Sequence, residues 1–335
     1  MIVILKDRPD EEQLAGLVSW LKDQGISVHP TVGSSQTILG LVGDTSRIDM
    51  DLISALDIVS SVKRVQEPYK NANRKFHPDD TVIRVGSARF GGGAFALIAG
   101  PSVVESEEQI LSVAEAVKEA GADLLKGLAF KPRSSPYAFQ GLGIEGIRLL
   151  LLAREKTGLP LVSEIHDASQ LPLFEEIDVL MVGARNMQNY ALLRALGKTD
   201  KPVILKRGFS NTYEEWLMSA EYIMAGGNGK VILCERGIRT FEPSAAGTLD
   251  VACVPVLKEL THLPVIIDPS SAAGSYTFVG SLARAGAAAG ADGAMLGVHN
   301  DPMRALCDGP VSLTPERFRK TVKSLRDIHK LIMEE

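Results

Sequence analysis

The stretch PVILKRGFSNTYEEWLMSAEYIMAGGNGKVILCERG, residues 202–237, contains one complete strand–helix–strand unit. Its two ends, PVILKRG and KVILCERG, are short continuous apolar runs, which are typical of strands buried on both faces. Between them, residues 212–225 have the apolar spacing of a helix. Both strands end in two charged residues and a glycine. The unit therefore predicts a parallel sheet whose strands present charge at their carboxyl ends.

The same alternation runs from Phe95 to the end of the chain. It gives eight strand–helix units in about 240 residues, which predicts a (β/α)8 TIM barrel. A doubly wound parallel sheet is the alternative. The strands are expected at 95–100, 123–127, 160–165, 178–183, 202–208, 230–237, 264–270 and 292–298. The helices are expected at 105–120, 144–157, 168–176, 187–197, 212–225, 246–260, 277–290 and 314–333.

Residues 1–67 are expected to form a small domain of their own. Strands are predicted at 1–6, 26–32, 35–43 and 59–66, and helices at 11–25 and 46–56. The order βαββαβ is that of a ferredoxin-like domain. Residues 68–80 are polar and turn-rich, which predicts a linker and leaves 81–335 for the barrel.

The composition excludes several classes of protein. The chain of 335 residues is 45% hydrophobic and 23% charged, with a net charge of −5, so general binding to nucleic acid or anionic membranes is not expected. Three cysteines without a C-x-x-C pair favour neither a disulfide framework nor a zinc ribbon. The apolar start MIVIL is too short for a signal peptide, and no apolar run reaches membrane-spanning length. A cytoplasmic protein is expected.

Positive charge gathers after the predicted barrel strands, at the end of a TIM barrel where active sites are built. One such residue is usually a solvated surface charge, but here four of the strands deliver cations to one rim. Crowded like charges cost free energy unless an anion neutralises them, and Arg and Lys suit phosphates and carboxylates. The sequence thus predicts a site for a small polyanion, built from Lys126, Lys131, Arg133, Arg185, Lys206, Arg207 and Arg236.

Segments in all parts of the barrel resemble those of 3-deoxy-D-arabino-heptulosonate 7-phosphate (DAHP) synthases. The chain is most similar to the single-barrel subgroup with an N-terminal ferredoxin-like domain, and the likeness spans essentially its whole length. The segments are IAGPSVVES (98–106), AFKPRSSPYAFQG (129–141), VGARNMQNY (182–190), VILKRG (203–208), CERGIRTFE (234–242), TLDVACVPVLK (248–258) and DPSSAAG (268–274).

This family condenses phosphoenolpyruvate with erythrose 4-phosphate and opens the shikimate pathway. The resemblance implies that Lys131 lies near the carboxylate of phosphoenolpyruvate, and that Ala184, Arg185, Lys206 and Arg236 hold the rest of it, chiefly its phosphate.

The resemblance also implies that Arg133, Ser134 and Ser135 hold the phosphate of the aldehyde, and that Glu164 lies beside the reacting centre. We expect catalytic roles for Lys131, Glu164, Asp268 and Asp308. We expect substrate-binding roles for Lys126, Arg133, Ser134, Ser135, Ala184, Arg185, Lys206 and Arg236.

The chain departs from the family at the metal site, where the family uses Cys, His, Glu and Asp. The corresponding residues here are Ser102, Ser271, Gly297 and Asp308, so three of the four ligands are replaced. Serine is a poor ligand for borderline divalent cations, and glycine has no side chain to offer. The sequence therefore predicts no metal cofactor, with Lys131 as the electrophile and proton donor instead. A substitute site made of His299, Cys307 and Asp308 is the open alternative.

The aldehyde half of the pocket has also changed. Ala246 and Gly247 stand where the family commonly has Arg and Asn, and Ser275 and Tyr276 stand where basic residues follow the DPSH motif. A family arginine is replaced by Lys126. The phosphoenolpyruvate half thus keeps its charge, whereas the aldehyde half has lost some.

The sequence is compatible with three functions. The first is a metal-independent synthase, the second a diverged homologue with another acceptor or reaction, and the third a non-catalytic regulatory or partner-binding protein. Residues 1–67 identify no ligand, so an effector-binding domain and a packing or oligomerisation module are equal alternatives. By family resemblance we expect a homo-oligomer, a tetramer or a dimer.

Overall fold

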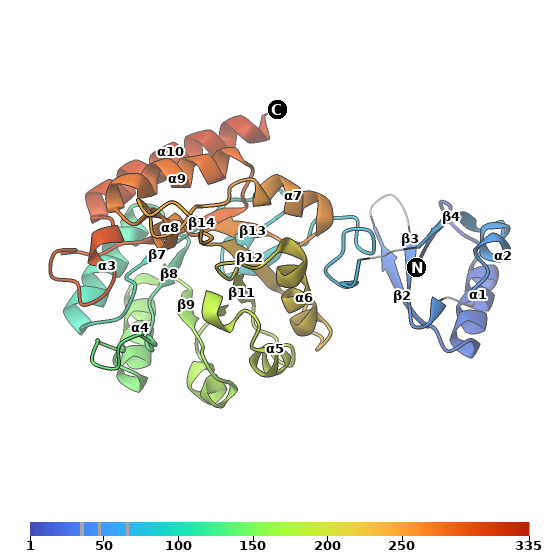
Figure 1. Ribbon diagram of the computed structural model, residues 1–335, viewed down its shortest axis with the longest axis horizontal. Helices are drawn as coiled ribbons and strands as arrows, with labels where there is room; N and C mark the ends of the chain where they lie inside the picture. Colours follow the sequence, from blue (N-terminus) through green and yellow to red (C-terminus); the bar gives the residue numbers. More distant parts are fainter. Residues whose placement is uncertain (34–36, 46–47, 65–66, 335) are drawn as a thin grey trace. The chain divides into compact units, whose positions relative to one another are not determined.

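The computed structural model describes residues 1–33, 37–45, 48–64 and 67–334. The chain forms two compact units (Figure 1). The first unit is residues 1–80 with 259–262, and the second is residues 81–258 with 263 onward. Parts of three predicted elements, at residues 35–36, 46–47 and 65–66, lie outside the described residues. No helix in the described ranges has both the length and the apolar character to cross a membrane.

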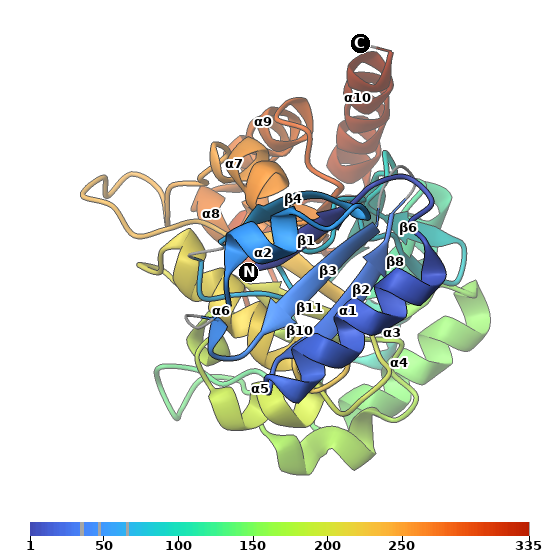
Figure 2. The same cartoon turned by 90° about the vertical axis from the view of Figure 1, so that its right-hand side faces the viewer.

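The first unit is a four-stranded antiparallel sheet with two helices, as predicted for a ferredoxin-like domain. The sheet order is β2-β3-β1-β4, and Figure 2 shows α1 and α2 over one of its faces. Val3, Leu5, Leu39 and Leu41 form the core with the α1 residues Leu17 and Leu21. The elements are β1 (Ile2–Leu5), α1 (Glu11–Asp23), β2 (Ser27–Val32), β3 (Thr37–Val42), α2 (Met50–Ser54) and β4 (Val59–Lys63).

The second unit is a closed barrel of eight parallel strands, so the doubly wound alternative is excluded (Figure 1). Each strand pairs with the next along the chain, and the last pairs with the first in the register Gly297 to Gly100. The strands are β7 (Ala96–Gly100), β8 (Leu124–Lys126), β9 (Leu161–Glu164), β10 (Val179–Val182), β11 (Val203–Lys206), β12 (Val231–Glu235), β13 (Val265–Ile267) and β14 (Gly293–Gly297).

Helices surround the barrel, and several of them begin with a side-chain cap. In α6, for example, the side chains of Thr212 and Glu215 each accept the other residue's backbone N–H, a reciprocal capping box. The helices are α3 (Glu107–Glu119), α4 (Ile144–Thr157), α5 (Tyr190–Leu196), α6 (Tyr213–Met224), α7 (Cys253–Leu260), α8 (Pro269–Ala273), α9 (Tyr276–Ala288) and α10 (Pro315–Met333). Shorter 3₁₀ turns are η2 (Ala168–Phe174), η3 (Ala184–Asn186) and η4 (Gly309–Val311).

Two predicted helices differ from those observed. The helix expected at 168–176 is the 3₁₀ turn η2, which contains Pro172, a residue that cannot donate an α-helical hydrogen bond. The helix expected at 246–260 begins only at Cys253. Residues 239–247 form an irregular loop instead, and that loop reaches the rim of the barrel.

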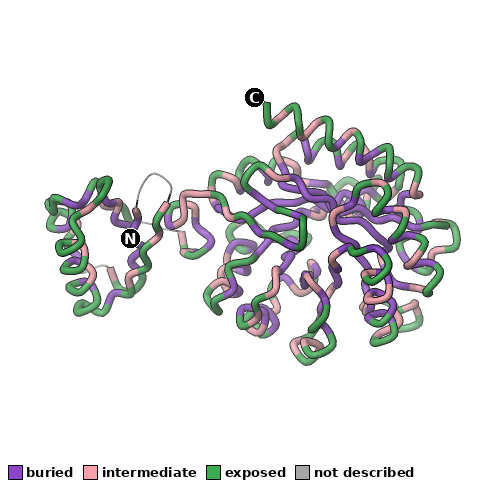
Figure 3. Tube along the Cα trace, turned by 180° about the vertical axis from the view of Figure 1, so that it is seen from behind, coloured by how far each residue is buried: buried purple, intermediate pink, exposed green. Residues whose placement is uncertain are grey.

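The barrel interior is closed by its own side chains and by a hairpin. The buried strands are purple in Figure 3, and their inward residues include Ile98, Val162, Ile204 and Met295. The hairpin of β5 (Ile83–Val85) and β6 (Ala88–Phe90), just ahead of the first barrel strand, joins this cluster. Because apolar side chains fill the barrel interior, the polar residues at the carboxyl ends of the strands are available to form a site.

Residues 141–146, GLGIEG, match the G-x-G-x-x-G pattern of dinucleotide-binding folds at the start of α4. They follow a long loop and not a strand, so the structural context of that motif is missing. A Cβ at Gly141 would lie 2.2 Å from the Ala129 carbonyl oxygen, so the glycine lets the 127–140 loop pack closely on itself.

Candidate active site

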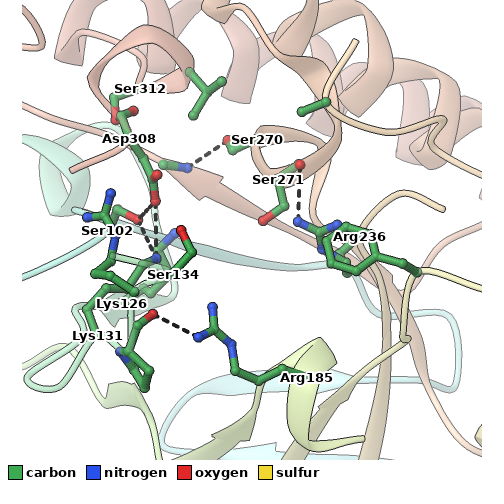
Figure 4. Close-up of a pocket in the computed structure, with 16 residues that line it drawn as sticks. Ser102, Lys126, Lys131, Ser134, Arg185, Arg236, Ser270, Ser271, Asp308 and Ser312 are labelled. Carbon is green, nitrogen blue, oxygen red and sulfur yellow. Dashed lines mark hydrogen bonds and ion pairs between the residues drawn. The ribbon is translucent and has the colours of Figure 1, made fainter. Parts of the chain in front are cut away.

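A cavity of about 650 Å³ opens at the carboxyl ends of the barrel strands (Figure 4). Its lining comes from the loops after β7, β8, β11 and β12, the end of β8, η3, the start of α8, the end of β14, and η4 with the residues on either side of it. The lining residues are Ser102, Lys126, Lys131, Pro132, Arg133, Ser134, Arg185, Phe209, Arg236, Ala246, Ser270, Ser271, Gly297, Asp308, Val311 and Ser312.

Most of the residues expected in a site share this cavity, although some do not reach it. Outside its lining lie Glu164, Ala184, Lys206, Asp268, Ser135 and Arg207. The expectation that Arg207 faces the anion site is wrong, because its guanidinium is paired with Glu235 (3.1 Å) and Asp250 (2.7 Å). Conversely, the expectations above included neither Phe209, Val311 nor Ser312. Phe209 directly follows the KRG segment, a position that could have drawn attention to it.

Three arginines of the cavity have only neutral partners. Arg185 donates to the Pro132 carbonyl (2.9 Å), and Arg133 to the Cys307 sulfur (3.0 Å). Arg236 donates to the Ser271 carbonyl (3.3 Å) and lies over the Phe209 ring, 4.4 Å from its centroid. Their ion pairs with acidic side chains are absent from the described part of the chain, so their charge is available to an anionic ligand.

Lys131 has a different environment, because Asp308 lies beside it. The Lys131 Nζ is 3.1 Å from Asp308 Oδ2 and 3.2 Å from Ser102 Oγ, and Ser102 donates its own hydroxyl hydrogen to the same carboxylate oxygen. Burial disfavours the Asp308 charge, but Lys131 and Ser102 outweigh it and lower the pKa of Asp308 to about 2. The three side chains form one cluster on a wall of the cavity (Figure 4).

Lys206 and Asp268 form a second ion pair, buried next to the cavity. The Lys206 Nζ is 2.6 Å from Asp268 Oδ2, and the Ser271 hydroxyl donates to the same oxygen (2.7 Å). Burial opposes both charges, yet the pairing keeps the pKa of Asp268 well below its usual range and raises the pKa of Lys206. Neither residue lines the cavity. If Lys206 holds a substrate phosphate, its ammonium must interact with both that phosphate and Asp268.

Lys126, at the end of β8, is 6% exposed. Gly100 on the neighbouring strand makes room for it, because a Cβ there would lie 1.9 Å from the Lys126 carbonyl oxygen. Burial, followed by the nearby charges of Lys206 and Lys131, lowers the pKa of Lys126 to about 8 against the opposing effect of Asp268 and Asp308. Lys126 lines the cavity, and no ion pair joins it to the described acidic residues.

Glu164 and His166 are held away from the cavity. Glu164 Oε1 lies 3.3 Å from His166 Nδ1, and a Cβ at Gly183 would come within 2.1 Å of the same Glu164 oxygen. The Glu164 carboxylate therefore occupies the space that Gly183 leaves free.

The residues at the family's metal positions do not fit a divalent ion. Ser102 and Ser271 direct their hydroxyls to Asp308 and Asp268, Gly297 has no side chain, and Asp308 is engaged by Lys131. Within the described ranges, no group of three or more His, Cys, Asp and Glu side chains could hold a metal ion.

The substitute set of His299, Cys307 and Asp308 is not brought together as ligands either. His299 Nε2 lies 3.3 Å from Glu105 Oε2, and Cys307 accepts from Arg133.

The other positions at which the chain departs from the family differ in where they lie. Ala246 lines the cavity with a methyl group. Ser275 caps α9, and the ring of Tyr276 packs against Arg317, whose Cζ lies 4.5 Å from the ring centroid. Neither residue contributes to the lining. Of residues 133–135, Arg133 and Ser134 line the cavity and Ser135 does not.

Comparisons with known proteins agree with this architecture. The sequence model of the DAHP synthetase I family matches residues 77–334, and that of the DAHP synthase ferredoxin-like domain matches residues 1–67. A phospho-2-dehydro-3-deoxyheptonate aldolase of Thermotoga maritima is 44% identical over 329 residues, which cover 98% of this chain and 97% of the relative. A 2-dehydro-3-deoxyphosphooctonate aldolase of Syntrophotalea carbinolica is 34% identical, covering 75% and 96%. The crystal structure of the Thermotoga maritima DAHP synthase superposes with a TM-score of 0.79 at 43% identity, covering 99% of this chain and 97% of the other.

Proposed function

The chain belongs to the DAHP synthetase I family of aldol-type carbon–carbon bond-forming enzymes, and from this we propose that it condenses phosphoenolpyruvate with a phosphorylated aldehyde without a divalent metal ion. By family resemblance the aldehyde is erythrose 4-phosphate. The observation that carries the proposal is a cavity with four cations, Lys126, Arg133, Arg185 and Arg236, that lack a carboxylate partner among the described residues.

Phosphoenolpyruvate suits this charge distribution because it carries a phosphate and a carboxylate on three carbons. Arg185 and Arg236 present guanidinium groups whose donors match phosphate oxygens. Lys131 offers a point charge for the carboxylate. Arg133 and Ser134, on the loop after β8, are then available for the phosphate of the second substrate.

We propose that Lys131 takes the catalytic role that the metal ion has in the family. Its ammonium is within hydrogen-bond distance of both Ser102 and Asp308, two of the four positions at which the family holds its ion. A fixed cation at this place stabilises negative charge on the aldehyde oxygen as C3 of phosphoenolpyruvate attacks. Water then adds at C2 and phosphate leaves. Glu164 and Asp268 would act through His166 and Lys206, with which they are paired.

The test is phosphate release from phosphoenolpyruvate and erythrose 4-phosphate by protein stripped of metal with a strong chelator. We expect turnover that neither chelator nor added manganese changes. Activity that appears only with added metal would contradict the metal-free mechanism. Absence of phosphoenolpyruvate binding would favour the non-catalytic alternative.

A different acceptor is the second candidate, and Ala246 is the observation that favours it. The cavity has a methyl group where the family has an arginine, and Gly247 follows it. An acceptor with less negative charge would fit such a surface better. Two results together would favour this candidate. Phosphoenolpyruvate should bind but release no phosphate with erythrose 4-phosphate, and it should release phosphate when an uncharged aldose is supplied.

For the N-terminal domain we propose an effector site, by analogy with relatives whose domains of this kind bind aromatic amino acids. The support is a groove of about 510 Å³ between α1 and α2, lined by Leu17, Trp20, Leu52 and Leu56 among others. We also propose a homo-oligomer. Light scattering tests the oligomer, and phosphate release with and without aromatic amino acids tests the effector.

A further inference from the structure

We propose that Lys126 is the proton carrier of this cavity: its amine meets the anionic substrate as an ammonium and exchanges the proton that the condensation moves. The inference rests on the proposed function for its substrate, phosphoenolpyruvate. It adds a catalytic role at a position where the resembling family has an arginine, a side chain that stays charged at any working pH.

The geometry separates Lys126 from the other two lysines of the site. Lys131 is bound by Asp308, and Lys206 by Asp268, each through a carboxylate oxygen at hydrogen-bond distance. Lys126 has neither, although it is almost fully buried and faces the cavity. Figure 4 shows it on the same side of the cavity as Ser102 and Lys131.

The charges around Lys126 come from four elements. Lys206 lies on β11 and Lys131 in the loop after β8, and both disfavour a third positive charge. Asp268, which follows β13, and Asp308, which precedes η4, favour it. Each carboxylate is already compensated by its own lysine. Burial and the two lysines therefore prevail, and the pKa of Lys126 falls to about 8.

An amine with such a pKa exchanges protons near neutral pH, where an ordinary lysine or an arginine does not. As C3 of phosphoenolpyruvate bonds to the aldehyde carbon, the C=O electron pair moves to the oxygen, which takes a proton from the Lys126 ammonium. Water then adds at C2, and the neutral Lys126 amine takes one proton from it. The second proton of that water leaves with the phosphate as the C2 carbonyl forms. Lys126 is thus restored in each turnover.

Binding of phosphoenolpyruvate should itself change the protonation of Lys126. Its negative charge favours the ammonium form, so binding raises the pKa of Lys126 and the site takes up a proton from solvent. As the pH rises through about 8, the free protein loses the Lys126 charge, and affinity for phosphoenolpyruvate falls. At pH 6 to 7 the amine is already protonated, so binding takes up little through Lys126.

The experiment is calorimetric titration of the full chain with phosphoenolpyruvate at pH 8, in buffers of different ionisation enthalpy. We expect uptake of about half a proton per ligand, because half the Lys126 side chains are neutral at that pH. The matched variant Lys126→Arg keeps the charge and cannot release it, so it should bind phosphoenolpyruvate without this uptake. Any proton exchange by the ligand is common to both proteins.

In turnover, Lys126→Arg should lower kcat by about 10²-fold, the usual contribution of one proton-transfer group, and flatten the change in rate near pH 8. The KM for phosphoenolpyruvate should change by less than about threefold. Equal proton uptake in the two proteins, or an unchanged pH profile in the variant, would overturn the proposal.

A ligand-free measurement keeps the inference separate from the proposed function. Trace acetylation with acetic anhydride, followed residue by residue with mass spectrometry from pH 6 to 10, reports the neutral fraction of each amine. Half-maximal labelling of Lys126 near pH 8 supports the proposal, and a midpoint above about 10, that of an ordinary lysine, refutes it. Heat of binding that is absent at every pH would instead count against phosphoenolpyruvate capture.

Discussion

Asp308 both neutralises Lys131 and holds it in place, and the two effects can be separated. Asp308→Asn removes the carboxylate while keeping the shape of the side chain, so the cavity gains one unit of positive charge and Lys131 loses its partner. We expect phosphoenolpyruvate to bind as well as before or more tightly. We expect kcat for phosphate release to fall by about 10²-fold, because the cation no longer has a fixed position at the aldehyde oxygen.

Steady-state kinetics with both substrates measure this split between KM and kcat. Asp301→Asn is the matched control, since Asp301 belongs to the same loop but lies outside the cavity lining. A rise in KM with unchanged kcat would mean that Asp308 serves binding only.

The buried pair of Lys206 and Asp268 predicts a stability effect. Asp268→Asn leaves Lys206 buried without its counter-charge, which should lower the free energy of unfolding by about 3–5 kcal/mol at pH 7. The folded-state pKa of Asp268 lies below its ordinary value of 3.8, so its stabilising effect is present above that pH and is lost as the pH falls below it. The difference between wild type and variant should therefore shrink in acid.

Urea unfolding between pH 3 and 7 tests this expectation. The double variant Lys206→Met with Asp268→Leu removes both charges and should recover most of the loss. Equal destabilisation by the single and double variants would show that packing, and not the unpaired charge, is responsible.

Among the elements, strands β7 and β14 end in a matched pair of glycines. Gly100 and Gly297 are partners in the strand register, but their surroundings differ. A Cβ at Gly100 would lie 1.9 Å from the Lys126 carbonyl oxygen, at a φ of +151°, whereas one at Gly297 would meet nothing nearer than 3.5 Å. Gly100→Ala must push β8 and Lys126 outward, while Gly297→Ala should be accommodated.

We therefore expect Gly100→Ala to lower the free energy of unfolding by more than about 2 kcal/mol and to weaken phosphoenolpyruvate binding, and Gly297→Ala to change stability by less than about 1 kcal/mol. Urea unfolding and calorimetry of the two variants decide the matter. If the two substitutions behaved alike, the close approach of β7 to β8 would not be what sets the position of Lys126.

The elements that sequence predicted best are those with strong local signals. Continuous apolar runs placed all eight barrel strands, and several of the charged residues after them line the cavity at the carboxyl ends of those strands. Apolar periodicity predicted an α-helix at 168–176, where the structure has the 3₁₀ turn η2. The prediction gave too little weight to Pro172. Residues 246–252 were included in a helix, although the loop before α7 extends into them.

The sequence could not predict which charged side chains pair with each other. Lys206 and Asp268 are 62 positions apart, and Lys131 and Asp308 are 177 apart, so no local pattern relates them. Both lysines were expected to face a substrate anion directly. Only the folded barrel shows that each has a carboxylate of its own, and that Lys126 does not.

At the scale of the whole molecule, the barrel brings together four positions that the family uses for metal, drawn from segments as far apart as residues 102 and 308. The scaffold holds these positions whether or not ligands occupy them. If these substitutions account for the proposed metal independence, then restoring the family's residues should restore metal binding. Ser102→Cys, Ser271→His and Gly297→Glu, combined, would place Cys, His and Glu side chains around Asp308, a donor set suited to Zn²⁺ and related ions.

A Cβ at position 297 can be accommodated, because its nearest atom would be Ser270 Oγ at 3.5 Å, and Gly297 lines the cavity into which a longer side chain would extend. The triple variant should retain about one equivalent of divalent metal per chain after dialysis, measured by elemental mass spectrometry, and adding Asp308→Asn should lower that amount. The metal would compete with Lys131 for Asp308, so the variant should also become sensitive to chelator in phosphate release where the wild type is not. A wild-type chain that retains a stoichiometric ion through the same dialysis would show that Lys131 does not replace one.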